Sequence, residues 1–223
     1  MKRQFFTLLA GLLCLSGSVA QAAKVDTLSV RSNAMNKNVT VLTVRPDKAV
    51  GGEKCPVIYL LHGHGGNAFT WMTIKPDLPQ IADREGIIFV CPDGKNSWYW
   101  DSPINPSYRY ETYVSKELIN YIDSQYRTYN NRKGRAITGF SMGGHGALWL
   151  AFRHPDTYGA CGSISGGVDI RPFPENWEMK QLLGPYSENP QRWNEYTVIN
   201  QLPYNSKSGP LAIIIDCGYY DFF

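Results

Sequence analysis

The sharpest chemical signal in the sequence is a serine set between glycines. Residues 139–143 read Gly-Phe-Ser-Met-Gly, a G-x-S-x-G motif with Ser141 at its centre. A β-rich stretch at 136–138 precedes the motif, and small helix-forming residues follow it. A tight strand-to-helix turn of this kind strains the serine backbone and lifts Oγ clear of the sheet. We therefore predict that Ser141 is the nucleophile of an acyl-transfer reaction; the alternative is a glycine-rich junction with an incidental serine.

An oxyanion formed at such a serine needs two converging N–H donors. We expect the first to be the backbone N–H of Met142, the next residue. Residues 62–66, His-Gly-His-Gly-Gly, follow an apolar stretch, and their glycines allow the backbone to turn N–H groups inward. We predict that His64 is the second donor and prefer it to Gly65. A metal held by His62 and His64 is the competing interpretation, which the lack of a nearby carboxylate in the sequence disfavours.

Acidic residues follow the last apolar stretch of the chain. In this architecture the serine, the acid and the histidine occur in that order along the sequence. Asp216 and Asp221 come after residues 211–215, where a carboxylate can orient an imidazole and stabilise its charged form. We expect Asp221 to be the triad acid rather than Asp216, and the competing role for either residue is to cap a turn.

The sequence contains no histidine after Asp221. Its four histidines stand at positions 62, 64, 145 and 154. His145 lies one helical turn after Ser141, where its ring would point into the fold, so we expect a packed histidine rather than a base. A serine without a base is a poor nucleophile, and residues 211–215 would need a further strand and helix to cover them. We therefore expect a chain that lacks the end of its domain, the catalytic histidine included.

The elements expected around these residues alternate between strands and helices. β-rich stretches at 28–30 and 39–44 predict an opening hairpin. Apolar runs predict buried strands at 56–61, 87–91, 135–138, 158–164 and 211–215. Apolar spacing and composition predict helices at 78–84, 108–126, 143–153, 179–183 and 190–194. The alternation predicts one α/β domain, with a mostly parallel central sheet and helices on both faces.

Composition and the first residues limit the class of protein. The 223 residues carry 22 Lys and Arg against 19 Asp and Glu, a net charge of +3, which is too small a surplus to indicate a nucleic-acid partner. Residues 1–22 combine a basic start, a short apolar run and small residues at the end. We predict a signal peptide cleaved after Ala22, a domain at 23–223, and a secreted or periplasmic protein without a membrane anchor.

The cysteines of residues 23–223 are spread thinly, mostly beside apolar runs. This placement favours buried free thiols, although an exported protein can form disulfides and four cysteines permit three pairings. The sequence has no Cys-x-x-Cys pair and no His/Cys cluster, so we expect neither a metal nor an organic cofactor. The four residues are Cys55, Cys91, Cys161 and Cys217.

An aromatic segment follows one of the expected strand-end loops. Residues 97–100 read Ser-Trp-Tyr-Trp and come shortly after a Pro-Asp-Gly turn. Ligands of open α/β sheets bind outside the carboxyl ends of the strands. Trp98 and Trp100 are therefore candidates to stack on a phenolic acyl group or a sugar face, and packing beneath the loop is an equal alternative.

With these motifs assembled, the chain resembles the esterase D and feruloyl esterase group of α/β-hydrolases, and it is also similar to the antigen 85 mycolyltransferases. The resemblance covers roughly residues 25–223 and rests on the stretches at 59–66, 91–94, 139–147 and 216–221. It implies an α/β-hydrolase fold that lacks its last strand and helix. It also places the nucleophile on Ser141, the oxyanion donors on His64 and Met142, and the acid on Asp221.

The resemblance implies a serine ester hydrolase. Members of the group cleave acyl esters, including acetyl and feruloyl groups on plant polysaccharides, and formyl thioesters of glutathione. Together with the signal peptide, this favours a secreted enzyme that removes acetyl or feruloyl-type groups from carbohydrate esters through an acyl-enzyme. The expected partner is a small-molecule or polysaccharide ester. The alternatives are a non-catalytic binding protein on the same fold, an acyltransferase, and a thioesterase like S-formylglutathione hydrolase.

Overall fold

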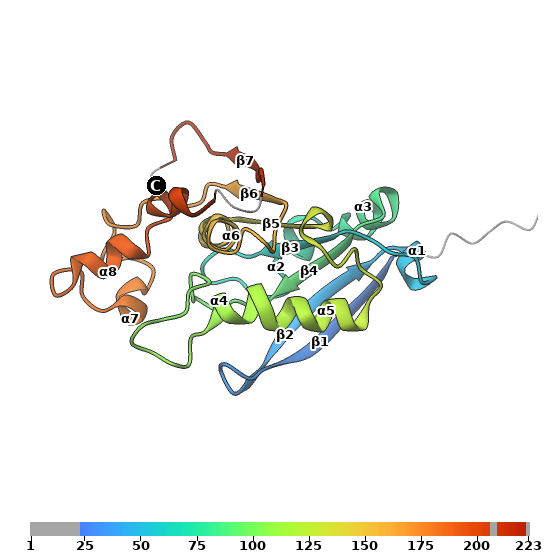
Figure 1. Cartoon of the computed structure of the whole chain (residues 1–223), viewed down its shortest axis with the longest axis horizontal. Helices are drawn as coiled ribbons and strands as arrows, with labels where there is room; N and C mark the ends of the chain where they lie inside the picture. The colour runs from blue at the N-terminus through green and yellow to red at the C-terminus, as the bar shows by residue number, and fades with distance from the viewer. Residues whose placement is uncertain (1–22, 206–208, 222–223) are drawn as a thin grey trace, which may run out of the picture.

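The computed structural model describes residues 23–205 and 209–221, and a seven-stranded sheet forms its centre (Figure 1). The strands are β1 (Lys24–Ser32), β2 (Lys37–Arg45), β3 (Val57–Leu61), β4 (Ile88–Pro92), β5 (Arg135–Phe140), β6 (Ala160–Ile164) and β7 (Ala212–Asp216). Their order across the sheet is β1-β2-β4-β3-β5-β6-β7. β1 and β2 form an antiparallel hairpin, β2 pairs antiparallel with β4, and all other neighbours are parallel. The expected opening hairpin and mostly parallel sheet are confirmed.

Helices connect the strands. They are α1 (Asp47–Val50), α2 (Thr70–Ile74), α3 (Leu78–Glu85), α4 (Tyr110–Thr112), α5 (Leu118–Gln125), α6 (Met142–Arg153), α7 (Met179–Leu183) and α8 (Pro190–Glu195). A π-helical turn, η1 (Tyr113–Glu117), joins α4 to α5, and the 3-10 helices are η2 (Arg132–Gly134) and η3 (Val198–Asn205). The one helix expected over 108–126 is therefore split by a change of helical pitch, while α6 and α7 lie where the sequence predicts them.

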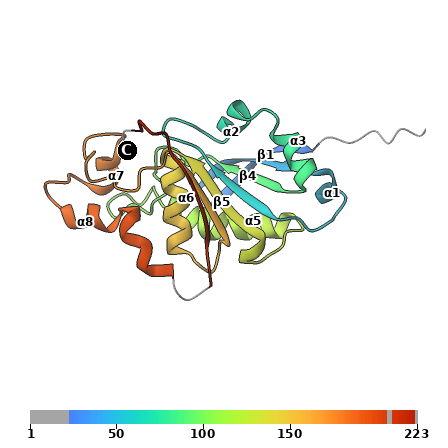
Figure 2. The same cartoon turned by 90° about the horizontal axis from the view of Figure 1, so that it is seen from above.

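Two separate cores lie on opposite faces of the sheet, because successive side chains of a strand point to opposite sides. In β2, Val39 and Val41 join the core beneath α5 and α6, whereas Leu42 and Val44 join the core beneath α3. The two helical layers are visible from above (Figure 2). This arrangement confirms the prediction of helices on both faces.

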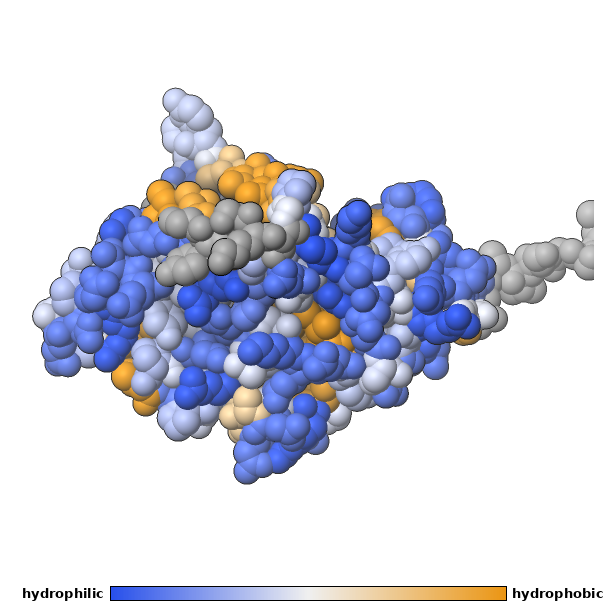
Figure 3. All heavy atoms as spheres, viewed as in Figure 1, coloured by the Kyte–Doolittle hydropathy of each residue, from blue (hydrophilic) through white to orange (hydrophobic). Residues whose placement is uncertain are grey.

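Strand β7 differs from the buried strand that the sequence predicts. It pairs with β6 in parallel, but it is the last strand of the order and its apolar side chains are exposed: Ile214 by 73% and Ile215 by 64%. Apolar surface is visible over this part of the sheet (Figure 3). The prediction of burial was wrong for these residues. An apolar run indicates that a strand is stabilised by burial, but burial also requires a neighbouring strand or helix, and the described residues place none over β7.

Three of the four cysteines are buried free thiols, as expected, and the fourth, Cys217, is exposed. Burial raises the pKa of Cys91 and of Cys161 to about 12, which keeps both thiols protonated. Among the helices that the structure describes, none is long and apolar enough to cross a bilayer. The expected signal peptide, residues 1–22, lies outside the described residues.

A buried ion pair links α5 to β5. One guanidinium N–H of Arg135 donates to Asp123 at 2.6 Å, and the two side chains are only 6% and 8% exposed. Removal of one partner leaves a buried charge uncompensated. We therefore expect Asp123→Ala to lower the free energy of unfolding by about 3–5 kcal/mol, measured by urea denaturation.

The matched control is Asp77→Ala, which removes an Asp that pairs with Lys75 on the surface, where both side chains are about half exposed. Exposed pairs contribute about 0–1 kcal/mol, so this variant should unfold at nearly the wild-type urea concentration. Equal losses from the two substitutions would contradict the view that burial makes the Asp123–Arg135 pair important.

Candidate active site

Ser141 occupies the turn between β5 and α6. Its backbone has φ 52° and ψ −122°, a region that residues with a side chain rarely adopt. Its N–H donates to the carbonyl of Ile164 at 2.9 Å, and its own carbonyl accepts from the N–H of His145 at 3.0 Å. The turn is thus attached to β6 on one side and to the first turn of α6 on the other.

The glycines of the motif allow this turn to pack closely against β3. A Cβ on Gly143 would lie 2.3 Å from the carbonyl oxygen of Leu61, and one on Gly139 would lie 2.4 Å from the backbone of Gly143. Neither contact can be relieved by a side-chain movement, because both involve backbone atoms. The strained strand-to-helix turn and the need for glycine, both predicted from the motif, are therefore present.

The loop after β3 has a free backbone N–H at the position that the sequence predicts, His64. The N–H of Gly65 donates to Oδ1 of Asn96 at 2.8 Å, so it is already engaged. The N–H of His64 donates to no group among the residues that the structure describes. Met142 is the first residue of α6, where an N–H has no acceptor within its own helix. This pattern supports His64 over Gly65 as a candidate donor.

The ring of His62 fixes the start of the same loop. Nε2 accepts from the N–H of Gly94 at 2.8 Å, so the proton of the neutral ring sits on Nδ1 and is donated to the carbonyl of Gly63 at 2.7 Å. Both ring nitrogens therefore bond to the protein, and neither is directed to a metal. The ring joins the loop after β3 to the loop after β4.

A polar contact network extends from this loop to the segment before α7. The side-chain N–H of Asn96 donates to Glu178 at 2.7 Å, and the same carboxylate lies 3.4 Å from Nε2 of His64. Glu178 has φ 60°, another left-handed residue. A cleft of about 380 Å³ lies beside these groups, lined also by Gly65 and Tyr108. Sequence reasoning missed Asn96 and Glu178, although the position of Asn96 after a strand end was a usable signal.

His145 is packed inside the fold, as expected. Its Nε2 accepts from the indole N–H of Trp100 at 2.9 Å, so Nδ1 carries the proton and donates to the carbonyl of Gly167 at 2.7 Å. Burial lowers the pKa of His145 to about 4, and the bond to Gly167 opposes only part of that shift. The ring is neutral near pH 7 and both nitrogens are engaged, so it is not available as a base.

Trp98 and Trp100, the candidates for substrate stacking, require a correction. They are 1% and 0% exposed, and their rings stack on one another at 5.5 Å with 22° between the planes. Trp98 also packs edge-on against His145 at 5.1 Å. The rings fill the space beneath the loop, which was the alternative interpretation, and offer no face to a ligand.

Asp216 and Asp221 lie at the carboxyl edge of the sheet, two strands from Ser141. Asp216 of β7 lies opposite Ile164 of β6, and the carbonyl of Ile164 accepts a hydrogen bond from the N–H of Ser141. Neighbouring strands are about 4.8 Å apart, which places β7 about 10 Å from β5. The backbone N–H of Asp221 donates to Gly218 at 3.0 Å in the turn beyond.

Three of the four histidines form ring hydrogen bonds away from Ser141, whereas Nε2 of His64 has no hydrogen-bond partner among the described residues. His62 and His145 each use both ring nitrogens, as described above, and Nε2 of His154 lies 2.9 Å from Glu111. His64 lies against Glu178. Oγ of Ser141 forms no hydrogen bond with any residue that the structure describes. Ser141, the loop that carries His64, and Asp216 and Asp221 lie at one edge of the sheet, and none of these rings is hydrogen-bonded to the serine.

A family model described as "Putative esterase" matches residues 32–221. The chain belongs to this esterase family. It is 32% identical over 147 residues to an acetyl esterase of Caldicellulosiruptor saccharolyticus, a match that covers 62% of this chain and 54% of that protein. The chain spans between 32% and 54% of the length of three curated relatives that it matches.

Solved structures confirm the α/β-hydrolase fold. An S-formylglutathione hydrolase from Agrobacterium tumefaciens has a TM-score of 0.74 at 24% identity, with 90% of this chain and 77% of that chain covered. A ferulic acid esterase from Anaeromyces mucronatus, solved with ferulic acid, has a TM-score of 0.58 at 17% identity, with 92% and 88% covered. The resemblance to an esterase group, stated from the motifs, is confirmed.

The Asn96 contact gives a first test of the site. In Asn96→Ala the N–H of Gly65 and the carboxylate of Glu178 both lose a partner, so the loop that carries His64 is less well held. We expect kcat for p-nitrophenyl acetate to fall about tenfold with KM nearly unchanged, less than the roughly 10²–10³ lost with an oxyanion donor itself. Asn130→Ala, at an exposed position far along the chain, is the control. A rise in KM alone would contradict a positioning role for Asn96.

The buried ring of His145 gives a second test. Its pKa of about 4 in the folded state lies below its ordinary value of 6.5, so the unfolded chain binds more protons between these pH values. The stabilising contribution is fully present above about pH 6.5 and is lost as the pH falls toward 4, by at most about 1.4 kcal/mol per pH unit. The unfolding free energy of His145→Gln should depend less steeply on pH across this window. An unchanged slope would show that His145 is not the titrating group.

Proposed function

We propose that this chain carries the nucleophile of an exported serine carboxylic-ester hydrolase that removes acetyl or feruloyl-type groups from carbohydrate esters. The observation that carries the proposal is the strained turn at Ser141, opposite a loop whose His64 N–H is unengaged. Kinship with an acetyl esterase and the structural likeness to a ferulic acid esterase support this substrate class. The signal-peptide pattern of residues 1–22 supports export.

The proposed reaction has two halves. Oγ of Ser141 attacks the ester carbonyl carbon while a base takes its proton, and the N–H groups of His64 and Met142 stabilise the oxyanion. Collapse breaks the bond to the alcohol, which leaves with that proton and gives an acyl-serine. Water, deprotonated by the same base, then attacks the acyl carbon; the bond to Oγ breaks, the acid is released, and Oγ of Ser141 takes the proton back from the base. Asp221 orients the base and stabilises its charged form.

The base in this proposal is a histidine encoded after residue 223. Three of the four histidines are hydrogen-bonded elsewhere, and the fourth, His64, lies against Glu178. The exposed apolar β7 is a suitable neighbour for the strand and helix that would deliver the fifth. The same observations favour one competing function, a binding protein that keeps the pocket without a base. The codons that follow residue 223 discriminate between the two: a loop with a histidine supports the enzyme, and a stop codon supports the binding protein.

The experiment compares the 223-residue chain with the gene product that includes those codons. We expect the longer protein to hydrolyse p-nitrophenyl acetate on the order of 10⁴–10⁶ times faster, the usual loss when a triad member is missing. Ser141→Ala should abolish the gain, whereas Ser124→Ala, an exposed serine of α5, should not. Full turnover by the 223-residue chain would place the base among the residues described above and overturn the proposal.

Substrate class is tested separately with acetylated xylan, feruloylated arabinoxylan and S-formylglutathione. Preference for the two carbohydrate esters is the expected result, and preference for the thioester would overturn this part of the proposal. An added sugar acceptor distinguishes transfer to sugar from transfer to water, because only an acyltransferase would yield a new acylated sugar.

A further inference from the structure

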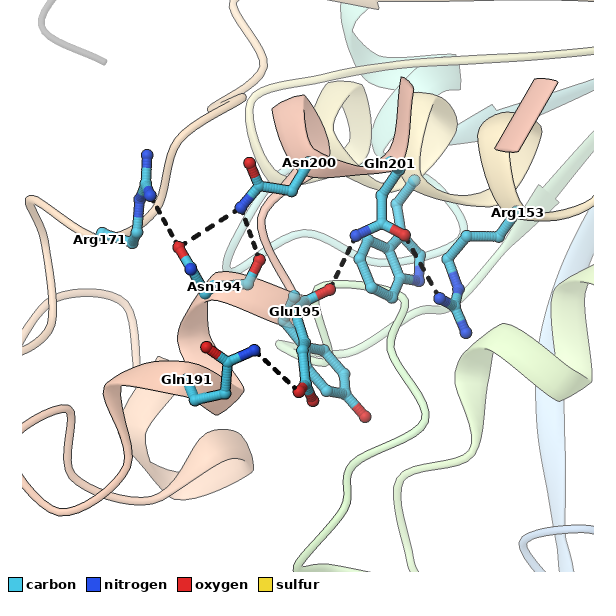
Figure 4. A pocket seen from close by; sticks show the side chains of 9 residues that line it. Arg153, Arg171, Gln191, Asn194, Glu195, Asn200 and Gln201 are labelled. Carbon is cyan, nitrogen blue, oxygen red and sulfur yellow. Dashed lines mark hydrogen bonds between the residues drawn. The ribbon is translucent and has the colours of Figure 1, made fainter. Parts of the chain in front are cut away.

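A second cavity lies away from the serine. It is an open cleft with a volume of about 530 Å³, bordered by the C-terminal part of α6, by α8 and by η3 (Figure 4). Trp149 and Arg153, which line it, are 8 and 12 residues after Ser141, so they lie about 12 to 18 Å further along the axis of α6. The volume is within the roughly 300–1,000 Å³ of small-molecule sites.

The cations of this cavity are already matched by carboxylates. Arg171 donates to both oxygens of Asp169, at 2.7 and 2.6 Å, and Nε of Arg153 donates to Glu111 at 2.9 Å. Glu195 adds a further negative charge to the lining, and its carboxylate accepts from the side-chain amide of Gln191 at 3.2 Å. An anionic ligand would therefore meet an excess of carboxylate charge.

The remaining polar groups of the lining are amides that can both donate and accept. Asn200 uses its Nδ2 on Asn194 at 2.8 Å, and Gln191 uses its Nε2 on Glu195 at 3.2 Å, which leaves both side-chain carbonyl oxygens as acceptors. The second terminal N–H₂ group of Arg153 donates to no described residue and remains a donor. Figure 4 shows the amides gathered between Arg171 at one end and Arg153 at the other.

From this chemistry we propose that the cavity binds a neutral oligosaccharide. A sugar hydroxyl can donate to the free amide oxygens of Asn200 and Gln191 and accept from the free N–H₂ group of Arg153, and a neutral ligand avoids the carboxylates. The lining offers too little open apolar surface for a lipid, because Trp149 is 1% exposed and stacked beneath Tyr196. The site would hold part of a saccharide chain away from the reacting ester. The choice of xylan-type sugars rests on the proposed function; the existence of the site does not.

The test measures the binding of xylohexaose by isothermal titration calorimetry. We expect the wild-type chain to bind it and Gln191→Ala/Asn200→Ala to bind it at least tenfold more weakly, because two exposed acceptors are lost without disturbance of a buried group. Asn130→Ala, at an exposed position outside the cavity, should bind like the wild type. Each single variant should show part of the loss, which keeps the test valid if the double variant does not fold.

Three outcomes would overturn the inference: no binding by the wild-type chain, equal binding by the double variant, or tighter binding of an acidic hexamer such as oligogalacturonate. Hydrolysis of p-nitrophenyl acetate should be the same in the double variant and in the wild type. Binding of xylohexaose by a gene product that includes the codons after residue 223 but has no esterase activity would reject the proposed function and keep this site. Esterase activity without xylohexaose binding would keep the proposed function and reject this site.

Discussion

The site depends on one close approach between backbones. Gly143, in the first turn of α6, comes so near to Leu61 at the end of β3 that a single added carbon would lie 2.3 Å from its carbonyl oxygen. This contact places the beginning of α6 directly against the end of β3. The tight turn that joins β5 to α6 holds Ser141 at a φ of 52°. A residue in such a conformation costs on the order of 1–3 kcal/mol, which the surrounding hydrogen bonds and the packing of α6 must offset.

Further backbone contacts bring Ser141, the His64 loop and Asp216 to the same edge of the sheet. The turn at Ser141 is held by Ile164 at the end of β6, and the N–H of Ser165 next to it donates to Asp216 at the end of β7, at 2.8 Å. The loop that carries His64 begins where β3 ends and is held by Asn96 from the loop after β4. The five parallel strands β3, β4, β5, β6 and β7 thus end at the same edge of the sheet, where the residues of the proposed chemistry and their supports lie.

Much of this arrangement follows from the sequence because local patterns determine it. Short apolar runs fix β3, β5 and β6, and the glycines around Ser141 permit one type of turn. The errors come from residues whose environment depends on distant segments. In the sequence, Trp98 and Trp100 stand among polar residues in an expected loop. They are nevertheless buried, because His145 and the segment before α7 pack on them. Likewise, the cavity near Arg153 requires α6, α8 and η3 to meet, which no local pattern encodes.

The most direct measurement is covalent labelling of the whole gene product with paraoxon, followed by peptide mass spectrometry. A strained, oxyanion-stabilised serine reacts with such an organophosphate, whereas ordinary serines do not. The account predicts a single diethylphosphoryl adduct on the peptide that contains Ser141, lost when the protein is denatured before labelling. An adduct on another residue, or an unlabelled Ser141 in folded and catalytically active protein, would contradict it.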